Sequence, residues 1–190
     1  MSPILRVGID LDGVIIDHHH HKCLLARERG VALEPWQANS NIMKQFVPGD
    51  VYDAIQEPLY SRLTPEAPPV EGALENLRRL PAEIYIVSAR RPDNVRYAQE
   101  WLRRHGVYDF LPADRVFFCG SGAEKRGYCE RLGLSVFLDD RLNFLEMLPP
   151  ETRKVLFDPD GVAAKLRPGG HIGVAGDWDR FAALLADQRS

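Results

Sequence analysis

Residues 7–14 read VGIDLDGV, a short apolar run that passes directly into two aspartates and a glycine. A run of this kind, bounded by polar residues and glycine, is typical of a buried strand followed by a turn. In open α/β sheets, ligands bind beyond the carboxyl ends of the strands. Asp10 and Asp12 therefore stand where a functional site is expected, provided that further strands flank the first.

Further strand and helix patterns alternate along most of the chain. We predict strands over residues 4–9, 83–87, 116–119, 135–138 and 154–157. We predict helices over residues 71–80, 93–105, 124–132 and 178–186. Strands that alternate with helices indicate an α/β fold, here a Rossmann-like parallel sheet with helices on both faces.

Residues 17–65 interrupt this alternation. They contain no good strand pattern, and short helical stretches are expected near residues 22–29, 36–46 and 51–63. The proline-rich sequence TPEAPP follows at residues 64–69, and proline stiffens a connector and stops helices. We therefore predict an α/β core made of residues 1–16 and 66–190, with a small α-helical cap inserted as residues 17–65.

Composition narrows the classes of function. The chain has 190 residues, with 24 Lys and Arg against 27 Asp and Glu, and its net charge of -3 argues against nucleic-acid binding driven by bulk charge. Its three cysteines, Cys23, Cys119 and Cys129, form neither a disulfide framework nor a CxxC metal motif, which favours a reduced, cytoplasmic setting. No apolar run approaches the ~18 residues of a membrane span, so we expect no membrane association.

Polar side chains follow several of the predicted strands, and we expect them to meet at one edge of the sheet. These are Asp10 and Asp12 after the first strand, Ser88, Ala89, Arg90 and Arg91 after the second, and Asp139 and Asp140 after the fourth, with Lys125 at the start of a helix. Four neighbouring carboxylates repel one another and need a cation. Oxygen ligands without His or Cys favour Mg²⁺.

Such a set suits phosphoryl transfer. One carboxylate can attack a phosphate as the nucleophile, and a second can protonate the leaving alcohol and then activate water. Ser88, backbone N–H groups and Lys125 can hold the phosphate oxygens. Each residue also has an ordinary structural interpretation, since Asp and Ser often cap turns and helices and Lys is usually solvated. Arg90 and Arg91 fit phosphate recognition and an exposed pair equally well.

The same segments resemble the haloacid dehalogenase (HAD) superfamily, over essentially the whole chain. The motifs, in family order, are VGIDLDGV at residues 7–14, IYIVS at 84–88, Lys125, and VFLDD at 136–140. The resemblance implies that Asp10 is the nucleophile and Asp12 the general acid/base. It implies that Ser88 and Lys125 bind the phosphate, and we include the neighbouring Ala89 and Arg90 among the predicted phosphate-binding residues. It also implies Mg²⁺ held by Asp10, the backbone carbonyl of Asp12 and Asp140, with Asp139 in support.

The resemblance further narrows the reaction. In this superfamily an aspartate two residues after the nucleophile, here Asp12, marks phosphatases and phosphomutases rather than dehalogenases. The small helical cap and the sequences SAR at 88–90 and DDR at 139–141 look most like the 5′(3′)-deoxyribonucleotidase and 5′-nucleotidase group. We therefore expect a magnesium-dependent phosphomonoesterase that works through an aspartyl-phosphate on nucleoside 5′-monophosphates or deoxynucleotides.

Other interpretations stay open. The substrate could instead be a sugar phosphate or a nucleic-acid end, although a small-molecule phosphomonoester is favoured, and the chain could be a non-catalytic phosphate-binding module. A homodimer also stays open. Four consecutive histidines, residues 18–21, fit a solvated helix start or a substrate contact at the hinge of the cap. The aromatic residues Trp36, Phe46, Tyr52 and Tyr60 fit a small core of the cap or a surface that stacks a base.

Overall fold

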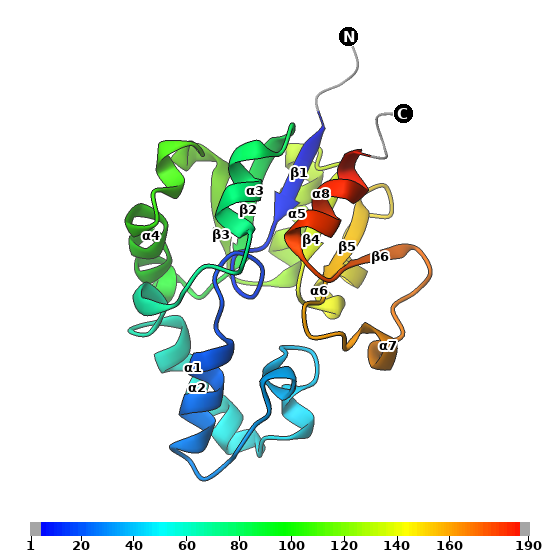
Figure 1. Cartoon of the computed structure of the whole chain (residues 1–190). Helices are drawn as coiled ribbons and strands as arrows, with labels where there is room; N and C mark the ends of the chain where they lie inside the picture. The colour runs from blue at the N-terminus through cyan, green and yellow to red at the C-terminus, as the bar shows by residue number, and fades with distance from the viewer. Residues whose placement is uncertain (1–4, 187–190) are drawn as a thin grey trace.

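The α/β prediction is confirmed by the computed structural model, which describes residues 5–186. Its parallel sheet has the strand order β3-β2-β1-β4-β5-β6 (Figure 1). The strands are β1 (Arg6–Ile9), β2 (Glu83–Ala89), β3 (Val116–Cys119), β4 (Val136–Asp139), β5 (Arg153–Phe157) and β6 (Ile172–Ala175). Because β2 and β4 flank β1, the turns after these three strands open at the same edge of the sheet.

One strand was missed by the sequence analysis, and one lies partly outside the described residues. The edge strand β6 reads IGVA and buries only its first and last residues, so its apolar pattern is too short to stand out. The predicted first strand began at Ile4, which lies outside the described residues; β1 is described from Arg6 onward. The other predicted strands agree with the structure to within two residues at their ends.

Side chains of the strands alternate between two apolar layers, as the pleat requires. Val7 and Ile9 of β1 point into one layer, which is covered by α3 (Ala73–Arg79), α4 (Val95–Arg104) and α8 (Trp178–Ala186). Phe137 of β4 points into the other layer, which is covered by α5 (Gly122–Leu132) and α6 (Leu142–Met147). The remaining core elements are the short turns η4 (Pro92–Asn94), η5 (Val107–Asp109) and η6 (Ala113–Arg115), and α7 (Ala163–Leu166).

The insertion between β1 and β2 is helical and has its own small core. It contains α1 (His19–Arg27), η1 (Pro35–Ala38), η2 (Met43–Gln45), α2 (Gly49–Tyr60) and η3 (Thr64–Glu66). Its buried apolar residues are Leu25, Met43, Val47, Ile55 and Leu59. In Figure 1 this segment lies beyond the carboxyl ends of the strands. It therefore stands over the edge of the sheet where ligands are expected.

The predicted helix over residues 36–46 is wrong. The chain forms the two short 3-10 turns η1 and η2 there, separated by an irregular loop. Asn39 explains the break, since its side-chain Oδ1 accepts hydrogen bonds from the backbone and side-chain nitrogens of Asn41 at 3.0 and 3.1 Å. Short polar side chains that bond the backbone in this way compete with helix formation.

Two connectors join the insertion to the core, and both are anchored. They run side by side, because Asp17 N donates to Pro68 O at 2.9 Å and Val70 N donates to Ile15 O at 2.8 Å. The indole N–H groups of two buried tryptophans hold them from the core: Trp178 donates to Val14 O at 2.9 Å and Trp101 to Ala67 O at 2.7 Å. The division into residues 1–16 and 66–190 against 17–65 stays a prediction, and these anchors are where its hinges would lie.

The described residues contain no helix that is both long enough and apolar enough to cross a membrane. The expected cytoplasmic location stays a prediction.

Candidate active site

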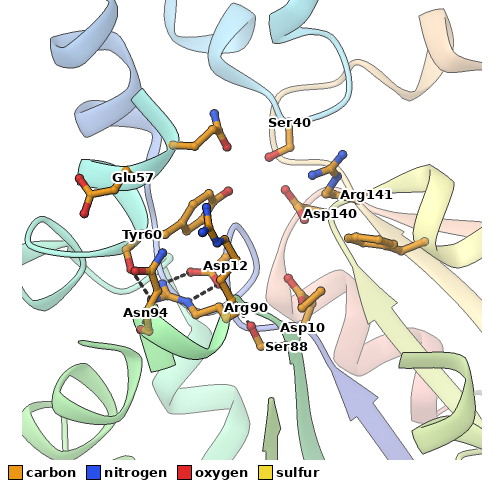
Figure 2. A pocket seen from close by; sticks show the side chains of 14 residues that line it. Asp10, Asp12, Ser40, Glu57, Tyr60, Ser88, Arg90, Asn94, Asp140 and Arg141 are labelled. Atoms are coloured by element: carbon orange, nitrogen blue, oxygen red, sulfur yellow. Dashed lines mark hydrogen bonds and ion pairs between the residues drawn. The ribbon is translucent and has the colours of Figure 1, made fainter. Parts of the chain in front are cut away.

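A cavity of about 360 Å³ opens between the strand ends and the helical insertion (Figure 2). The core contributes the turns after β1, β2 and β4 to its wall, and the insertion contributes the loop after η1 and the end of α2. Among the predicted site residues, the cavity is lined by Asp10, Asp12, Ser88, Ala89, Arg90 and Asp140. Lys125 and Asp139 are fully buried in contact with this group. The structure thus brings all the predicted residues to one place.

Asp10 follows the end of β1 and is paired with a lysine inside the core. Lys125 Nζ lies 2.7 Å from Asp10 Oδ1 and 2.6 Å from Asp139 Oδ2. Burial raises the pKa of Asp10 to about 7, even though the Lys125 ammonium acts in the opposite direction and Asp139 adds to the rise. Burial likewise raises the pKa of Asp139. One ammonium therefore does not fully compensate the carboxylates that surround it.

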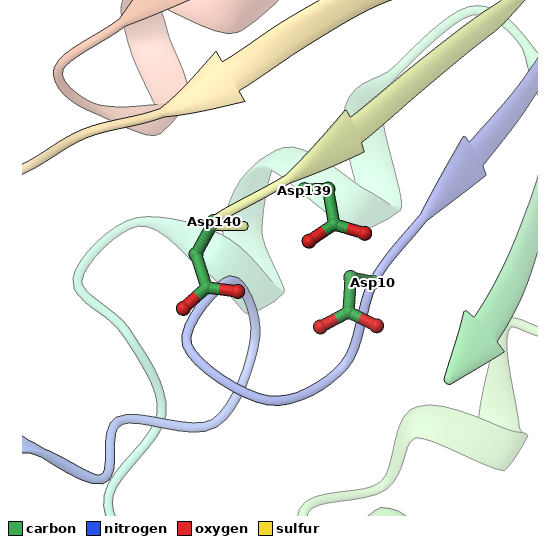
Figure 3. A group of neighbouring side chains, drawn as sticks. All are labelled: Asp10, Asp139 and Asp140. Atoms are coloured by element: carbon green, nitrogen blue, oxygen red, sulfur yellow. The ribbon is translucent and has the colours of Figure 1, made fainter. Parts of the chain in front are cut away.

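A third carboxylate, Asp140, completes a group that could hold a metal ion (Figure 3). Asp10, Asp139 and Asp140 each place one oxygen within 4.8 Å of the others. Asp139 is already engaged, because its Oδ2 faces Lys125 and its Oδ1 accepts from Arg141 N at 2.8 Å. Asp140 Oδ1 is buried and has no hydrogen-bond partner among residues 5–186. Asp140 is thus the better candidate for a direct ligand, and Asp139 for a supporting residue.

Gly13 makes room for this arrangement. Its φ of +87° lies in the left-handed region, and a Cβ there would stand 2.4 Å from Asp140 Oδ2. Glycine is the residue that accepts such a backbone conformation and such a close approach. The turn after β1 therefore wraps directly around the Asp140 carboxylate. Carboxylate oxygens with one unsatisfied, buried acceptor fit a hard divalent cation such as Mg²⁺.

Asp12 lies in the opposite electrostatic environment. Arg90 forms a bidentate ion pair with both of its oxygens: Nε donates to Oδ2 at 2.8 Å, and Nη2 donates to Oδ1 at 2.5 Å (Figure 2). His18 Nε2 adds a bond to Oδ1 at 2.7 Å, and Ser88 Oγ one to Oδ2 at 3.3 Å. Burial alone would raise the pKa of Asp12, but the Arg90 guanidinium, with help from His18, holds it well below its usual range. Asp12 is therefore a carboxylate in this structure.

Arg90 uses all five of its N–H donors in this conformation. Besides Asp12, its Nη1 donates to Tyr60 O at 2.9 Å and Asn94 O at 3.3 Å, and its Nη2 donates to Thr64 Oγ1 at 3.1 Å. A guanidinium has five donors and no acceptor. Phosphate binding by Arg90 stays a prediction, and it would require Arg90 to release one of these partners.

Tyr60, one of the aromatic residues considered for base stacking, lines the cavity, but Asn41 and the partners of the histidines were not predicted. The solvated-helix interpretation of the histidine run is wrong for His18, which is 1% exposed and bonded to Asp12, and for His19. His19 Nδ1 lies 2.9 Å from Asp17 Oδ1, and its Nε2 lies 2.9 Å from Asp160 Oδ2. Asn41 Nδ2 donates to the backbone oxygen of Asp140 at 2.7 Å, so the insertion also contacts the acidic group. Four histidines in a row signal unusual chemistry, but their sequence gives no hint of these partners.

Known proteins resemble this chain in sequence and in fold. Residues 2–161 match the family described as 5′ nucleotidase, deoxy (pyrimidine), cytosolic type C protein. A Bacillus cereus protein named "Putative nucleotidase" is 23% identical over 154 residues, which cover 76% of this chain and 80% of that protein.

Two solved structures show the same fold at low sequence identity. A conserved haloacid dehalogenase-like protein of unknown function from Agrobacterium tumefaciens matches with a TM-score of 0.70 and 15% identity, covering 99% of this chain and all of the other. A HAD family hydrolase from Deinococcus radiodurans, solved with bound phosphate and sodium, matches with a TM-score of 0.61 and 19% identity, covering 98% and 97%. These likenesses confirm the HAD-like core expected from the four motifs.

Proposed function

The chain belongs to the family of the 5′ nucleotidase, deoxy (pyrimidine), cytosolic type C proteins, and from this we propose that it hydrolyses nucleoside 5′-monophosphates or deoxynucleotides with the help of Mg²⁺. As a HAD-class member of this family it is a phosphomonoester hydrolase. The proposal adds the substrate class, the metal and an aspartyl-phosphate intermediate on Asp10.

One observation supports the mechanism above all others: two aspartates that line the same cavity are held in opposite environments. Asp10 has a pKa raised to about 7 by burial, whereas Arg90 and His18 hold the pKa of Asp12 well below its usual range. Two carboxyl groups whose surroundings separate their pKa values can take different roles in one reaction. The raised pKa alone would keep Asp10 protonated, but a cation held by Asp10, Asp139 and Asp140 would favour its ionised form, as a nucleophile requires. Asp12 lies outside that acidic group and suits proton transfer.

The proposed reaction has two steps. Asp10 attacks the phosphorus atom, the bond to the leaving oxygen breaks, and the leaving alcohol takes a proton from Asp12. Asp12, now a carboxylate, removes a proton from water, which attacks the phosphorus and frees Asp10 and inorganic phosphate. Because Asp12 is ionised in this structure, the first step needs a proton on it. An incoming phosphate dianion would favour this, since a nearby negative charge raises a carboxyl pKa.

The remaining residues would bind and orient the phosphate. Ser88 and Ala89 line the cavity at the end of β2, and Lys125 Nζ lies 2.7 Å from Asp10 Oδ1. Asp10, the backbone carbonyl of Asp12, and Asp140 would hold Mg²⁺, with Asp139 in support. When bound there, the cation would supply positive charge that offsets the negative charges of the phosphate and the carboxylates.

The size of the cavity supports a small substrate. About 360 Å³ lies at the lower end of the range for small-molecule sites, ~300–1,000 Å³. Tyr60, Gln56 and Glu57 of α2 line the part contributed by the insertion, where the leaving group would lie. A mononucleotide fits this description better than the end of a nucleic-acid strand, because the chain also carries a net charge of -3.

A phosphate-release assay over a panel of monoesters tests the proposal. The panel holds ribo- and deoxyribonucleoside 5′-monophosphates, sugar phosphates and p-nitrophenyl phosphate, each with Mg²⁺ and with a chelator. We expect the largest kcat/KM on a nucleotide, and no turnover with the chelator. A sugar phosphate as the best substrate would overturn the substrate class, and full activity with the chelator would overturn the metal. Absence of turnover on every ester would favour a phosphate-binding module.

A further inference from the structure

His18 holds the Asp12 carboxylate from the start of the insertion. It directly precedes α1 and is 1% exposed. Its Nε2 lies 2.7 Å from Asp12 Oδ1, and because a carboxylate only accepts, the imidazole is the donor. His18 Nδ1 is buried and has no hydrogen-bond partner among residues 5–186. The only hydrogen bond of the His18 ring among the described residues is therefore the one from Nε2 to Asp12.

Arg90 holds the same carboxylate from the core, and is itself bound to the far end of the insertion. Its Nη1 donates to Tyr60 O at 2.9 Å, at the end of α2, and its Nη2 donates to Thr64 Oγ1 at 3.1 Å, at the start of η3. Thr64 is fully buried and in turn donates to Leu59 O at 3.0 Å. Arg90 is thus held partly by the core, through Asn94 O, and partly by two residues of the insertion.

Tyr60 packs against both of these residues. Its ring meets the His18 ring edge-on, with centroids 5.4 Å apart at 75°, and the Arg90 guanidinium lies 5.5 Å from its centroid. Figure 2 shows Tyr60 and Arg90 beside Asp12 at the wall of the cavity. The two ends of the insertion and the core therefore meet at one carboxylate.

We propose that His18 and Arg90 are positioning residues that fix the orientation of Asp12, and that they do so fully only while the insertion lies against the core. If residues 17–65 moved away, Asp12 would lose its bond from His18, and Arg90 would lose its bonds to Tyr60 and Thr64. Proton transfer would then depend on closure of the site, whereas the Asp10–Lys125 pair, made by the core alone, would stay in place. This inference rests on the proposed role of Asp12 as general acid/base.

A positioning role differs from a purely structural one in its dependence on the leaving group. The value of kcat/KM reports the steps up to the first irreversible one, here transfer of the phosphoryl group to Asp10. An alkyl leaving group, such as the ribose oxygen of a nucleotide, needs a proton from Asp12 in that step. A p-nitrophenolate leaving group does not. A misplaced Asp12 should therefore lower kcat/KM for the nucleotide alone.

Three histidine variants distinguish the effect of the His18 N–H donor from the effect of its ring packing against Tyr60. His18→Phe keeps a ring against Tyr60 and removes the N–H, and His18→Gln returns an N–H close to the position of Nε2. His20→Phe alters an exposed histidine in the first turn of α1 and serves as the control. We expect His18→Phe to lower kcat/KM for a nucleoside 5′-monophosphate about 10–100-fold, with little change for p-nitrophenyl phosphate. His18→Gln should recover most of the loss, and His20→Phe should match the wild type.

Arg90→Lys distinguishes positioning from phosphate binding. Lysine keeps the charge but cannot form the bidentate pair of hydrogen bonds that the planar guanidinium makes to both oxygens of Asp12. If Arg90 positions Asp12, the variant loses far more kcat/KM on the nucleotide than on p-nitrophenyl phosphate. If Arg90 binds the phosphate instead, the variant raises KM for both esters in equal proportion, and its part in the inference fails.

The outcomes for the inference and for the proposed function are distinguishable. An equal loss on both esters, or no loss, in folded His18→Phe overturns the positioning role of His18 while leaving an active phosphatase. Circular dichroism establishes that each variant is folded, and His18→Leu, which also lacks the N–H donor, provides the test if His18→Phe does not fold. Failure of the wild type to hydrolyse any monoester overturns the proposed function and this inference with it.

Discussion

The two sides of the candidate site are built differently. On one side, Asp10 faces Lys125 and Asp139, which all belong to the core. On the other side, Asp12 faces Arg90 and His18, and both of these depend on the insertion. Burial raises the pKa of Asp10 to about 7, whereas the Arg90 guanidinium holds the pKa of Asp12 well below its usual range. In the proposed mechanism, the core would thus provide the nucleophile and the acidic group, and the insertion would take part in controlling the proton.

Removal of the Asp10 charge should have the largest effect. Asp10→Asn keeps the volume but loses the attacking oxygen anion, so we expect turnover to fall on the order of 10⁴-fold or more on every ester. The comparison predicts that this loss is independent of the leaving group. Steady-state assays on a nucleotide and on p-nitrophenyl phosphate measure it, with circular dichroism as the check on folding. Near-wild-type turnover by a folded variant would remove Asp10 from the mechanism.

Removal of the Asp12 charge should have an effect that depends on the leaving group, unlike removal of the Asp10 charge. Asp12→Asn can neither protonate the leaving alcohol nor activate water, and loss of general acid–base catalysis costs ~10²–10⁴-fold. We expect the full loss in kcat/KM on an alkyl ester and a much smaller one on p-nitrophenyl phosphate. Equal losses in kcat/KM on the two esters would contradict a leaving-group role for Asp12.

Lys125→Met should destabilise the core side. The substitution leaves Asp10 and Asp139 buried without their ammonium partner, and breaking a buried pair in this way costs about 3–5 kcal/mol. Denaturant unfolding without divalent cations measures the change in the free energy of unfolding. The double variant Lys125→Met/Asp139→Asn should recover part of the loss, because one of the two stranded charges is gone. A single variant as stable as the wild type would show that this ion pair contributes little.

The smallest effect expected is on the attachment of the insertion, through His19. Burial alone would lower the pKa of His19, but its bonds to Asp160 and Asp17 outweigh burial and raise it from 6.5 to about 9. A raised folded pKa means that the stability from this contact is complete below pH 6.5 and is lost as the pH rises through about 9. Thermal unfolding of the wild type and His19→Gln should therefore differ more at pH 6 than at pH 9.5. A difference that grows with pH would contradict this sign.

The sequence allowed the core side to be predicted much better than the insertion. Asp10, Ser88 and Asp140 each follow a strand, and a parallel sheet brings the ends of neighbouring strands together whatever the details of packing. Lys125 was placed near them by its position at the start of a helix between two strands, and the family motifs agreed with that placement. The register of one strand against the next was not needed for these predictions.

The contacts of the insertion could not be predicted in the same way. The bonds of His18 to Asp12 and of His19 to Asp160 depend on how a separate helical unit docks on the core. No local pattern of hydrophobicity encodes that docking. The helix predicted over residues 36–46 is broken because the Asn39 side chain accepts a hydrogen bond from Asn41 N. The edge strand β6 was missed because its apolar pattern is too short to indicate a strand.

The most direct test of the account is to trap the intermediate in Asp12→Asn. With p-nitrophenyl phosphate, phosphoryl transfer to Asp10 needs no acid and should stay fast, whereas hydrolysis of the product needs Asp12 as the base and should be slow. Acid quenching followed by mass spectrometry of the peptides should then find one phosphoryl group on Asp10, and none in the double variant Asp10→Asn/Asp12→Asn. Absence of the adduct in an Asp12→Asn protein that still releases p-nitrophenolate, or its presence on another residue, would contradict the account.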